Sequence, residues 1–179
     1  MRRMALPRDY SGQNCSAARA LEVIGERWTL LIVRDAFYGV RRFSDFLAHL
    51  DIPRAVLTDR LNALVEAEVL ERVPGANSRG HDEYIITEKG IALWPIVRSL
   101  AGWGDRYYAS NGSLRTFSHA DCGGRVDAAS RCARCDKAVP PADTIINPGP
   151  GLKHQKPRTD PVSAILAKPR RLLEPMHLG

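Results

Sequence analysis

The sequence predicts a mainly α-helical chain with one small antiparallel β-hairpin, an α+β fold of the winged helix-turn-helix type. Residues 43–50 and 53–66 have the apolar period of two short helices separated by a tight turn. Residues 69–73 and 82–86 alternate like half-buried strands on either side of the turn-rich segment 74–81. This order of elements is typical of units that place their second helix in a DNA groove.

Large apolar residues form the inward face of each helix of this pair. In the first helix they are Phe43, Phe46, Leu47 and Leu50, and in the second they are Leu57, Leu61, Leu64 and Val65. Pro53 suits the first turn of the second helix, because an amide hydrogen would have no partner there. Off the apolar face, the second helix carries polar or small side chains, which we expect to be exposed: Arg54, Ala55, Thr58, Asp59 and Asn62.

Two apolar segments precede this pair, and one follows it. Residues 17–25 have the pattern of a short amphipathic helix, and residues 28–37 are almost wholly apolar, which predicts the central core helix. From Thr87 onward, apolar side chains recur along one face of a long helix. Pro95 lies inside that helix and should kink it by removing one backbone hydrogen bond.

Two tryptophans lie on the long helix after the hairpin. We expect Trp94 and Trp103 to pack against a second copy of the chain, because a single small domain offers little else to bury them. The alternative is packing of both side chains within one chain.

Several phrases of the sequence together resemble the HxlR family of bacterial winged-helix transcription regulators, relatives of the MarR group. They are ALEVIGERWTLLIVRD (20–35), RRFSDF (41–46), IPRAVLTDRL (52–61), YIITEKG (84–90) and WG (103–104). The resemblance covers roughly residues 14–108. It implies a homodimer built by the first and last helices of the domain. Such a dimer would bind a near-palindromic operator, with half-sites about one helical turn apart.

One position departs from the pattern of this family. Its members usually end the second helix of the pair with glycine, where this chain has Glu68. If the backbone is left-handed there, a residue other than glycine costs roughly 1 kcal/mol. We expect a slightly shifted helix end and an unchanged fold.

Nine residues are candidates for DNA contact. Four on the second helix suit base edges, since Arg pairs with guanine, Asn with adenine and a small side chain with the thymine methyl: Arg54, Ala55, Thr58 and Asn62. Three at the start of the first helix suit phosphate: Arg41, Arg42 and Ser44. Two in the hairpin tip suit phosphate or a minor groove: Arg79 and His81. A solvated surface role is the alternative for each.

The positive charge of the chain lies mostly outside this unit. The chain carries a net +6, but residues 150–179 contain six Lys or Arg and two acidic residues, a net +4. The other 149 residues therefore carry only +2. DNA affinity must then come from a few placed arginines, and Arg60 beside the buried Leu61 is as well placed for an internal ion pair.

A second chemical pattern lies beyond the winged helix. His119 and Cys122 form a His-x2-Cys knuckle, and nine residues later Cys132 and Cys135 form a Cys-x2-Cys knuckle. Two such knuckles can hold one zinc ion tetrahedrally, and no activating acid or base stands beside them, so we expect a structural metal. Asp121 could replace His119 as the fourth ligand. A pair of unmetallated hairpins, or a reversible Cys132–Cys135 disulfide, would also account for the pattern.

Cys15 stands alone before the first helix. With Ser16 as a possible cap and Arg19 one turn on, a helix N-terminus and a guanidinium would stabilise the thiolate and make it reactive. Some members of the resembled family sense oxidants at a cysteine in this position. The alternative is a small side chain tucked into the dimer interface.

These patterns divide the chain into three parts. We expect a winged helix with dimerisation helices over 14–112, a zinc-knuckle-like appendage over 113–147 and a proline-rich, basic, mostly extended tail over 148–179. Only residues 162–167 of the tail suit a short helix.

The expected function is that of a sequence-specific transcriptional regulator acting as a homodimer, with a possible small-molecule effector. No signal peptide or membrane-spanning run is evident, which favours a cytoplasmic protein with no membrane partner. No nucleophile–base pair or phosphate loop is evident either, so an enzyme is not expected. The alternative function is a protein-interaction scaffold that does not read DNA.

Overall fold

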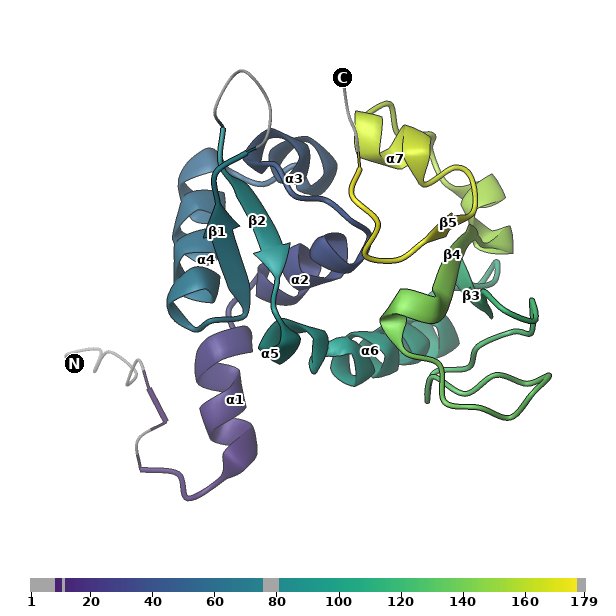
Figure 1. Ribbon diagram of the computed structural model, residues 1–179, viewed down its shortest axis with the longest axis horizontal. Helices are drawn as coiled ribbons and strands as arrows, with labels where there is room; N and C mark the ends of the chain where they lie inside the picture. The colour runs from purple at the N-terminus through teal and green to yellow at the C-terminus, as the bar shows by residue number, and fades with distance from the viewer. Residues whose placement is uncertain (1–8, 11, 76–80, 177–179) are drawn as a thin grey trace, which may run out of the picture.

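The computed structural model describes residues 9–10, 12–75 and 81–176. The elements follow one another along the chain as shown in Figure 1. They are α1 (Ser16–Ile24), α2 (Thr29–Phe37), α3 (Phe43–Leu50), α4 (Arg54–Glu66), β1 (Leu70–Val73), β2 (Glu83–Ile86), α5 (Glu88–Ile91), α6 (Trp94–Tyr108), β3 (Arg115–His119), η1 (Pro141–Asp143), β4 (Thr144–Pro148), η2 (Pro150–His154), α7 (Pro161–Ile165) and β5 (Arg170–Arg171). No helix in these ranges is long and apolar enough to cross a membrane.

Helices α2, α3 and α4 with strands β1 and β2 form the expected winged helix-turn-helix. Helix α2 contacts α3, α4 and β2, and its Ile32, Val33 and Phe37 are fully buried, which confirms it as the core helix. The turn between α3 and α4 passes through Asp51 in left-handed backbone (φ 52°). Strands β1 and β2 pair antiparallel in a register that sets Leu70 opposite Ile86.

The backbone at Glu68, just after α4, is left-handed, the condition under which a residue other than glycine is costly. This residue has a φ of 56°, and its amide donates to the carbonyl of Val65. The amide of Val69 then donates to Leu64, which closes the helix end. The hydroxyl of Thr87 donates to the carbonyl of Glu68 at 2.7 Å and fixes the turn against the second strand.

The prediction of one kinked helix after the hairpin is wrong. Residues 88–91 form α5, and a separate helix α6 begins at Trp94 with Pro95 in its first turn. A proline in a first turn removes no helical hydrogen bond, so the residue starts a helix here where a kink was expected. The hydroxyl of Thr87 caps α5 by accepting from the amide of Gly90 at 3.1 Å.

The expectation that both tryptophans pack against a second copy of the chain is wrong for Trp94. Trp94 is 3% exposed and packs within the chain, with its ring centroid 4.8 Å from that of Phe37 and 5.8 Å from that of Phe117. The reason is that β3 supplies an apolar partner from beyond the winged helix. Trp103 is 53% exposed and lies against Tyr107 and Tyr108.

The C-terminal third of the chain is folded, which corrects the expectation of an extended tail. Strands β3, β4 and β5 form an antiparallel sheet in that order, and β4 runs through the boundary expected between residues 147 and 148. Helix α7 packs against α3, and Figure 1 shows this part beside the winged helix. The apolar residues that hold it are buried: Val162, Leu166, Leu172 and Met176.

Two physical features explain why this segment folds. Its prolines begin elements, since Pro150 starts η2 and Pro161 starts α7, whose N-terminal amide at Ser163 is capped by Asp160. Its last described residues dock on the end of α2, where the amide of Met176 donates to Gly39. Gly39 has a φ of 92°, and a Cβ there would lie 1.8 Å from the carbonyl oxygen of Glu174, so only glycine fits.

Candidate nucleic-acid interface and metal site

Helix α4 presents its predicted polar face to solvent. It forms an outer edge of the winged helix in Figure 1, beside the β1–β2 hairpin. The residues expected to face bases are all exposed: Arg54, Ala55, Thr58 and Asn62. The Arg54 guanidinium lies 5.2 Å from the centroid of the Phe43 ring, and the Thr58 hydroxyl donates to the carbonyl of Arg54 at 3.0 Å. These contacts order the first turn of α4 without covering it.

Arg41 and Arg42 lie where the chain enters α3, next to the start of β2. Each guanidinium is 4.0 Å from the carboxylate of Glu83 on β2, and the backbone of Arg41 accepts a hydrogen bond from the amide of Tyr84. Glu83 therefore offsets part of their charge and ties both arginines to the hairpin. Ser44 lies in the first turn of α3, where its hydroxyl donates to Asp45 at 3.0 Å.

The hairpin tip supplies two further candidates for DNA contact. His81 is exposed, and Arg79 lies outside the described residues. Below the tip, Arg72 of β1 and Asp82 form an ion pair, with the Nε atom 2.6 Å from the carboxylate. This pair was not expected from the sequence; Arg72 lies opposite Tyr84, and Asp82, two residues before Tyr84, is on the same face of the hairpin. It joins the two strands at the end next to the tip and leaves Arg72 beside the candidate DNA surface.

Arg60 forms the internal ion pair that was its alternative role. Its guanidinium lies 3.3 Å from the carboxylate of Glu26, in the turn between α1 and α2. The side chain therefore anchors α4 to the preceding helices, and its charge is offset within the chain.

The four candidate metal ligands converge on one point. The Nδ1 atom of His119 and the Sγ atoms of Cys122, Cys132 and Cys135 all lie within 4.8 Å of one another. The Cys122 sulfur is 3.4 Å from that of Cys132 and 3.8 Å from that of Cys135. In a tetrahedral zinc site with Zn–S bonds of about 2.3 Å, sulfur atoms lie about 3.8 Å apart. The group therefore has the donor set and spacing of a metal site.

The surrounding chain fits this donor set. A Cβ at Gly124 would lie 2.5 Å from the Cys132 sulfur, so the loop needs glycine to pass the cluster. The backbone amides of Cys135 and Arg134 lower the pKa of the Cys132 thiol to about 6, which favours the thiolate that a metal binds. Asp121 is not part of the group: its carboxylate lies 3.6 Å from the other ring nitrogen of His119, where it orients the ring.

Cys15 is exposed at the N-terminus of α1. Its carbonyl accepts from the amide of Arg19 at 3.2 Å, and Cys15, not Ser16, holds the cap position. The Arg19 guanidinium pairs with Glu22 at 3.0 Å and also contacts the carbonyl of Tyr10. The thiol is therefore accessible, but the expected arginine is engaged elsewhere.

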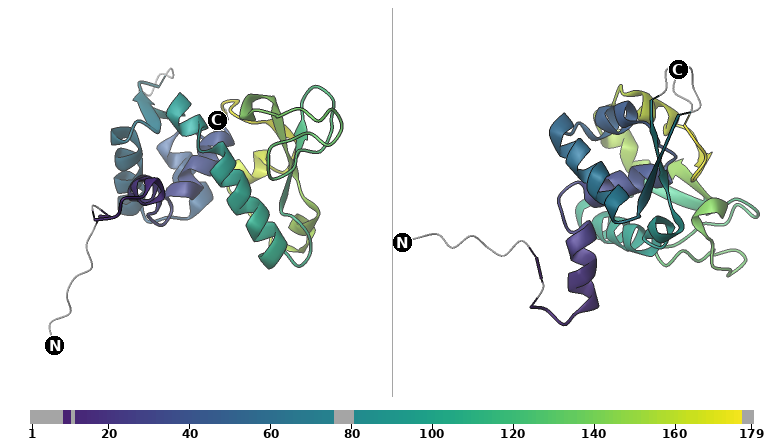
Figure 2. Two further views of the ribbon diagram at one scale, coloured as in Figure 1. Left: turned by 90° about the horizontal axis from the view of Figure 1, so that it is seen from below. Right: turned by 60° about the vertical axis from the view of Figure 1, so that its left-hand side comes forward.

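An apolar face is exposed along α6 and the N-terminal helices. Its large side chains are Leu21 of α1, Leu31 of α2, and Ile96, Leu100, Trp103, Tyr107 and Tyr108 of α6. Both figures of the whole chain show α1 projecting from the body (Figures 1 and 2). A projecting helix and a run of exposed aromatic residues are features of a surface that another chain covers.

Together, the exposed helix after a tight turn and the adjacent hairpin define a winged-helix DNA-binding protein. The comparisons with known proteins agree. Residues 23–111 match the model of the family described as HxlR-like helix-turn-helix. Mb3122 of Mycobacterium bovis, an uncharacterized HTH-type transcriptional regulator, is 41% identical over 139 residues, which are 77% of this chain and 88% of that protein.

More distant relatives and a solved structure give the same assignment. YvaP of Bacillus subtilis, also an uncharacterized HTH-type transcriptional regulator, is 34% identical over 86 residues, 48% of this chain and 80% of that protein. The crystal structure of PA1607, assigned as a transcription factor, has a TM-score of 0.60 at 38% identity and covers 71% of this chain and 88% of that one. The chain belongs to the HxlR-like helix-turn-helix family of transcriptional regulators.

Proposed function

We propose that this regulator binds a near-palindromic operator as a homodimer, with α4 of each protomer in a major groove. The observation that carries the proposal is the exposed face of α4, which offers Arg54, Ala55, Thr58 and Asn62 on a helix anchored from below by three buried leucines. An arginine and an asparagine on such a face have the donor pattern for guanine and adenine.

Phosphate contacts would come from the entrance to α3 and from the hairpin. Arg41 and Arg42 flank the first turn of α3, and Ser44 adds a hydroxyl at the same place. Arg79 and His81 of the hairpin tip would hold the backbone or enter the adjacent minor groove. Because Glu83 offsets part of the charge of the two arginines, we expect few phosphate contacts and a modest salt dependence.

The exposed apolar face of α6 supports the dimer. Trp103, Tyr107 and Tyr108 are exposed in one chain, and a two-fold dimer through α1 and α6 would bury them. Two α4 helices related in this way would meet half-sites about 34–36 Å apart. We place this activity in the cytoplasm, where such an operator is accessible.

We further propose that His119, Cys122, Cys132 and Cys135 hold a structural zinc ion. The ion would have no catalytic role. It would join the end of β3 to the two loops that follow it. The tight turn at Gly123 (φ 70°) and the close approach at Gly124 support this assignment. A regulatory input would come from a small-molecule effector or from oxidation of the exposed Cys15.

DNA fragments from upstream of the gene test the operator proposal directly. We expect the full-length protein to shift such a fragment and to protect two half-sites in a footprint, while a scrambled fragment of equal length binds only at low salt. Equal binding to both fragments across a salt series would instead support the alternative role, a protein-interaction scaffold without specific DNA contact.

A further inference from the structure

A cavity of about 480 Å³ lies between the winged helix and the C-terminal sheet. Its wall includes Arg34 of α2, Tyr38 directly after α2, His49 of α3, Arg115 and Phe117 of β3, and Arg158 before α7. This volume is in the range of small-molecule sites. The cavity exists because the C-terminal part folds back on α2 and α3, so it is not a property of the winged helix alone.

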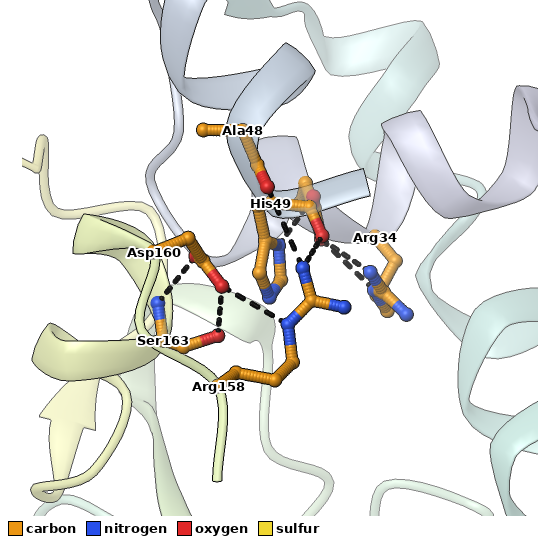
Figure 3. Close-up of polar contacts among 7 residues, drawn as sticks. Arg34, Ala48, His49, Arg158, Asp160 and Ser163 are labelled. Atoms are coloured by element: carbon orange, nitrogen blue, oxygen red, sulfur yellow. Dashed lines mark hydrogen bonds and ion pairs between the residues drawn. The ribbon is translucent and has the colours of Figure 1, made fainter. Parts of the chain in front are cut away.

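Most of the charge in this wall is balanced inside the protein. The fully buried carboxylate of Asp35 accepts from Arg34 at 2.7 Å and lies 2.7 Å from Nδ1 of His49. Arg158 is 3.0 Å from Asp160, and Figure 3 shows that its guanidinium also reaches the carbonyls at the end of α3. Arg34 and Arg158 are therefore both neutralised by a carboxylate.

Arg115 is different. One of its guanidinium nitrogens donates to the carbonyl of Leu166, and no carboxylate in the described ranges lies within ion-pair distance of it. Burial lowers the pKa of Arg115 and the charge of Arg34 adds to that effect, whereas Tyr38 and the Asp35 carboxylate act in the opposite direction. The nearby Asp105 also lines the cavity, but its field acts on the buried Arg98, whose guanidinium donates to the carbonyl of Asp127. Arg115 is therefore the guanidinium of this wall that is held by a carbonyl and has no direct carboxylate partner.

An apolar pocket of about 170 Å³ adjoins the larger cavity. It shares Arg34, Tyr38 and Phe117 with the larger cavity. Its other walls are mainly aliphatic and aromatic side chains: Leu30, Leu31, Trp94, Val97 and Leu100. A ligand that fits both spaces has one anionic group and one compact apolar body.

We propose that this joined cavity binds a small organic monocarboxylate, with its carboxylate on Arg115 and its apolar body against Phe117 and the leucines of α2. An occupant would touch α2, α3 and β3 at once. Arg158 and His49 connect the same cavity to the end of α3. A bound carboxylate would therefore change the position of α3 and of the adjoining α4 relative to the rest of the protein. The role as an effector site rests on the proposed DNA-binding function, whereas the binding site does not.

Titration calorimetry on the full-length protein without DNA tests the site. The probes are benzoate and octanoate, with benzyl alcohol and octanol as uncharged matches and sulfate as an anion without an apolar body. We expect at least one carboxylate to bind below about 10 mM and at least about tenfold more tightly than its alcohol, with no sulfate binding. Absence of carboxylate binding, or equal affinity for carboxylate and alcohol, overturns the proposal.

Variants locate the bound probe. Arg115→Gln should weaken carboxylate binding at least about tenfold, whereas Arg106→Gln, on the exposed side of α6, should not change it. A Cβ at Gly104 meets no atom within 4 Å, so Gly104→Leu fills the cavity without strain and should abolish binding even if Arg115→Gln does not fold. Unchanged binding in the Gly104 variant overturns the proposal.

A separate gel shift distinguishes the two proposals. Carboxylate binding without any operator binding contradicts the proposed function alone. Operator binding without carboxylate binding contradicts this inference alone.

Discussion

Replacing Asp35 with asparagine removes the charge at the centre of the buried cluster between α2 and α3. The Asp35 carboxylate is fully buried and accepts from the Nε and Nη2 atoms of Arg34 at 2.9 and 2.7 Å, and from Nδ1 of His49 at 2.7 Å. The amide of an asparagine would direct a donor at one of these donors and keep an acceptor for the other. One neighbour would then lose its acceptor in a poorly solvated site, and Arg34 would in either case lose its counter-charge.

The structure sets the size of the effect. Removing one partner of a buried ion pair costs about 3–5 kcal/mol, and the Arg34 side chain, which is 29% exposed, places Asp35→Asn near the lower limit. In a chain of this length, 1 kcal/mol moves the melting temperature by about 2–4 °C. We therefore expect a loss of about 3 kcal/mol in the free energy of unfolding and a drop of about 6–12 °C in Tm.

Urea unfolding followed by circular dichroism, together with thermal melts, measures this loss. Asp82→Asn is the matched control, because it breaks an ion pair with Arg72 that is exposed and should cost less than about 1 kcal/mol. If Asp35→Asn destabilises the protein no more than the control, the buried cluster does not stabilise the packing of α3 against α2.

Three further changes have expected outcomes. Glu68→Gly should raise the free energy of unfolding by up to about 1 kcal/mol in urea titrations, because it relieves left-handed backbone; a loss of stability would contradict the φ of 56°. Cys132→Ser should remove zinc from the purified protein as measured by atomic emission, whereas Cys15→Ser should leave the metal content unchanged; equal zinc in both would exclude the site. Trp103→Asp should convert the dimer to monomer in sedimentation velocity, because it places a charge in the proposed interface; an unchanged dimer would assign the interface elsewhere.

The winged helix could be predicted because its sequence determines it locally. The period of Leu57, Leu61 and Leu64 and the turn at Asp51 depend only on near neighbours, and the structure has both as expected. The left-handed residue Glu68 was also predictable, because the turn after a helix has few solutions.

The C-terminal part could not be predicted in this way. Its prolines suggested an extended tail, whereas Pro161 begins a helix whose Val162 and Leu166 are buried against the rest of the chain. Burial of this kind depends on contacts between distant segments, such as the bond from Leu173 to Phe37, which no local pattern reveals.

The same contrast between local patterns and contacts of distant segments applies to the candidate sites. Local spacing was enough to find the ligands His119, Cys122, Cys132 and Cys135, which the structure brings together. The cavity around Arg115 was missed, because its wall comes from α2, α3, α6 and β3, and no spacing in the sequence links them.

The central claim is that α4 recognises base edges, and one measurement tests it directly. Fluorescence anisotropy would compare wild type and Asn62→Ala on the footprinted operator and on a scrambled duplex at the same salt concentration, with Glu66→Ala at the far end of α4 as the control. We predict that Asn62→Ala weakens operator binding by about 1–3 kcal/mol, roughly five- to 150-fold, and leaves scrambled-duplex binding unchanged. An equal loss on both duplexes, or no loss on the operator, would contradict base recognition by this face.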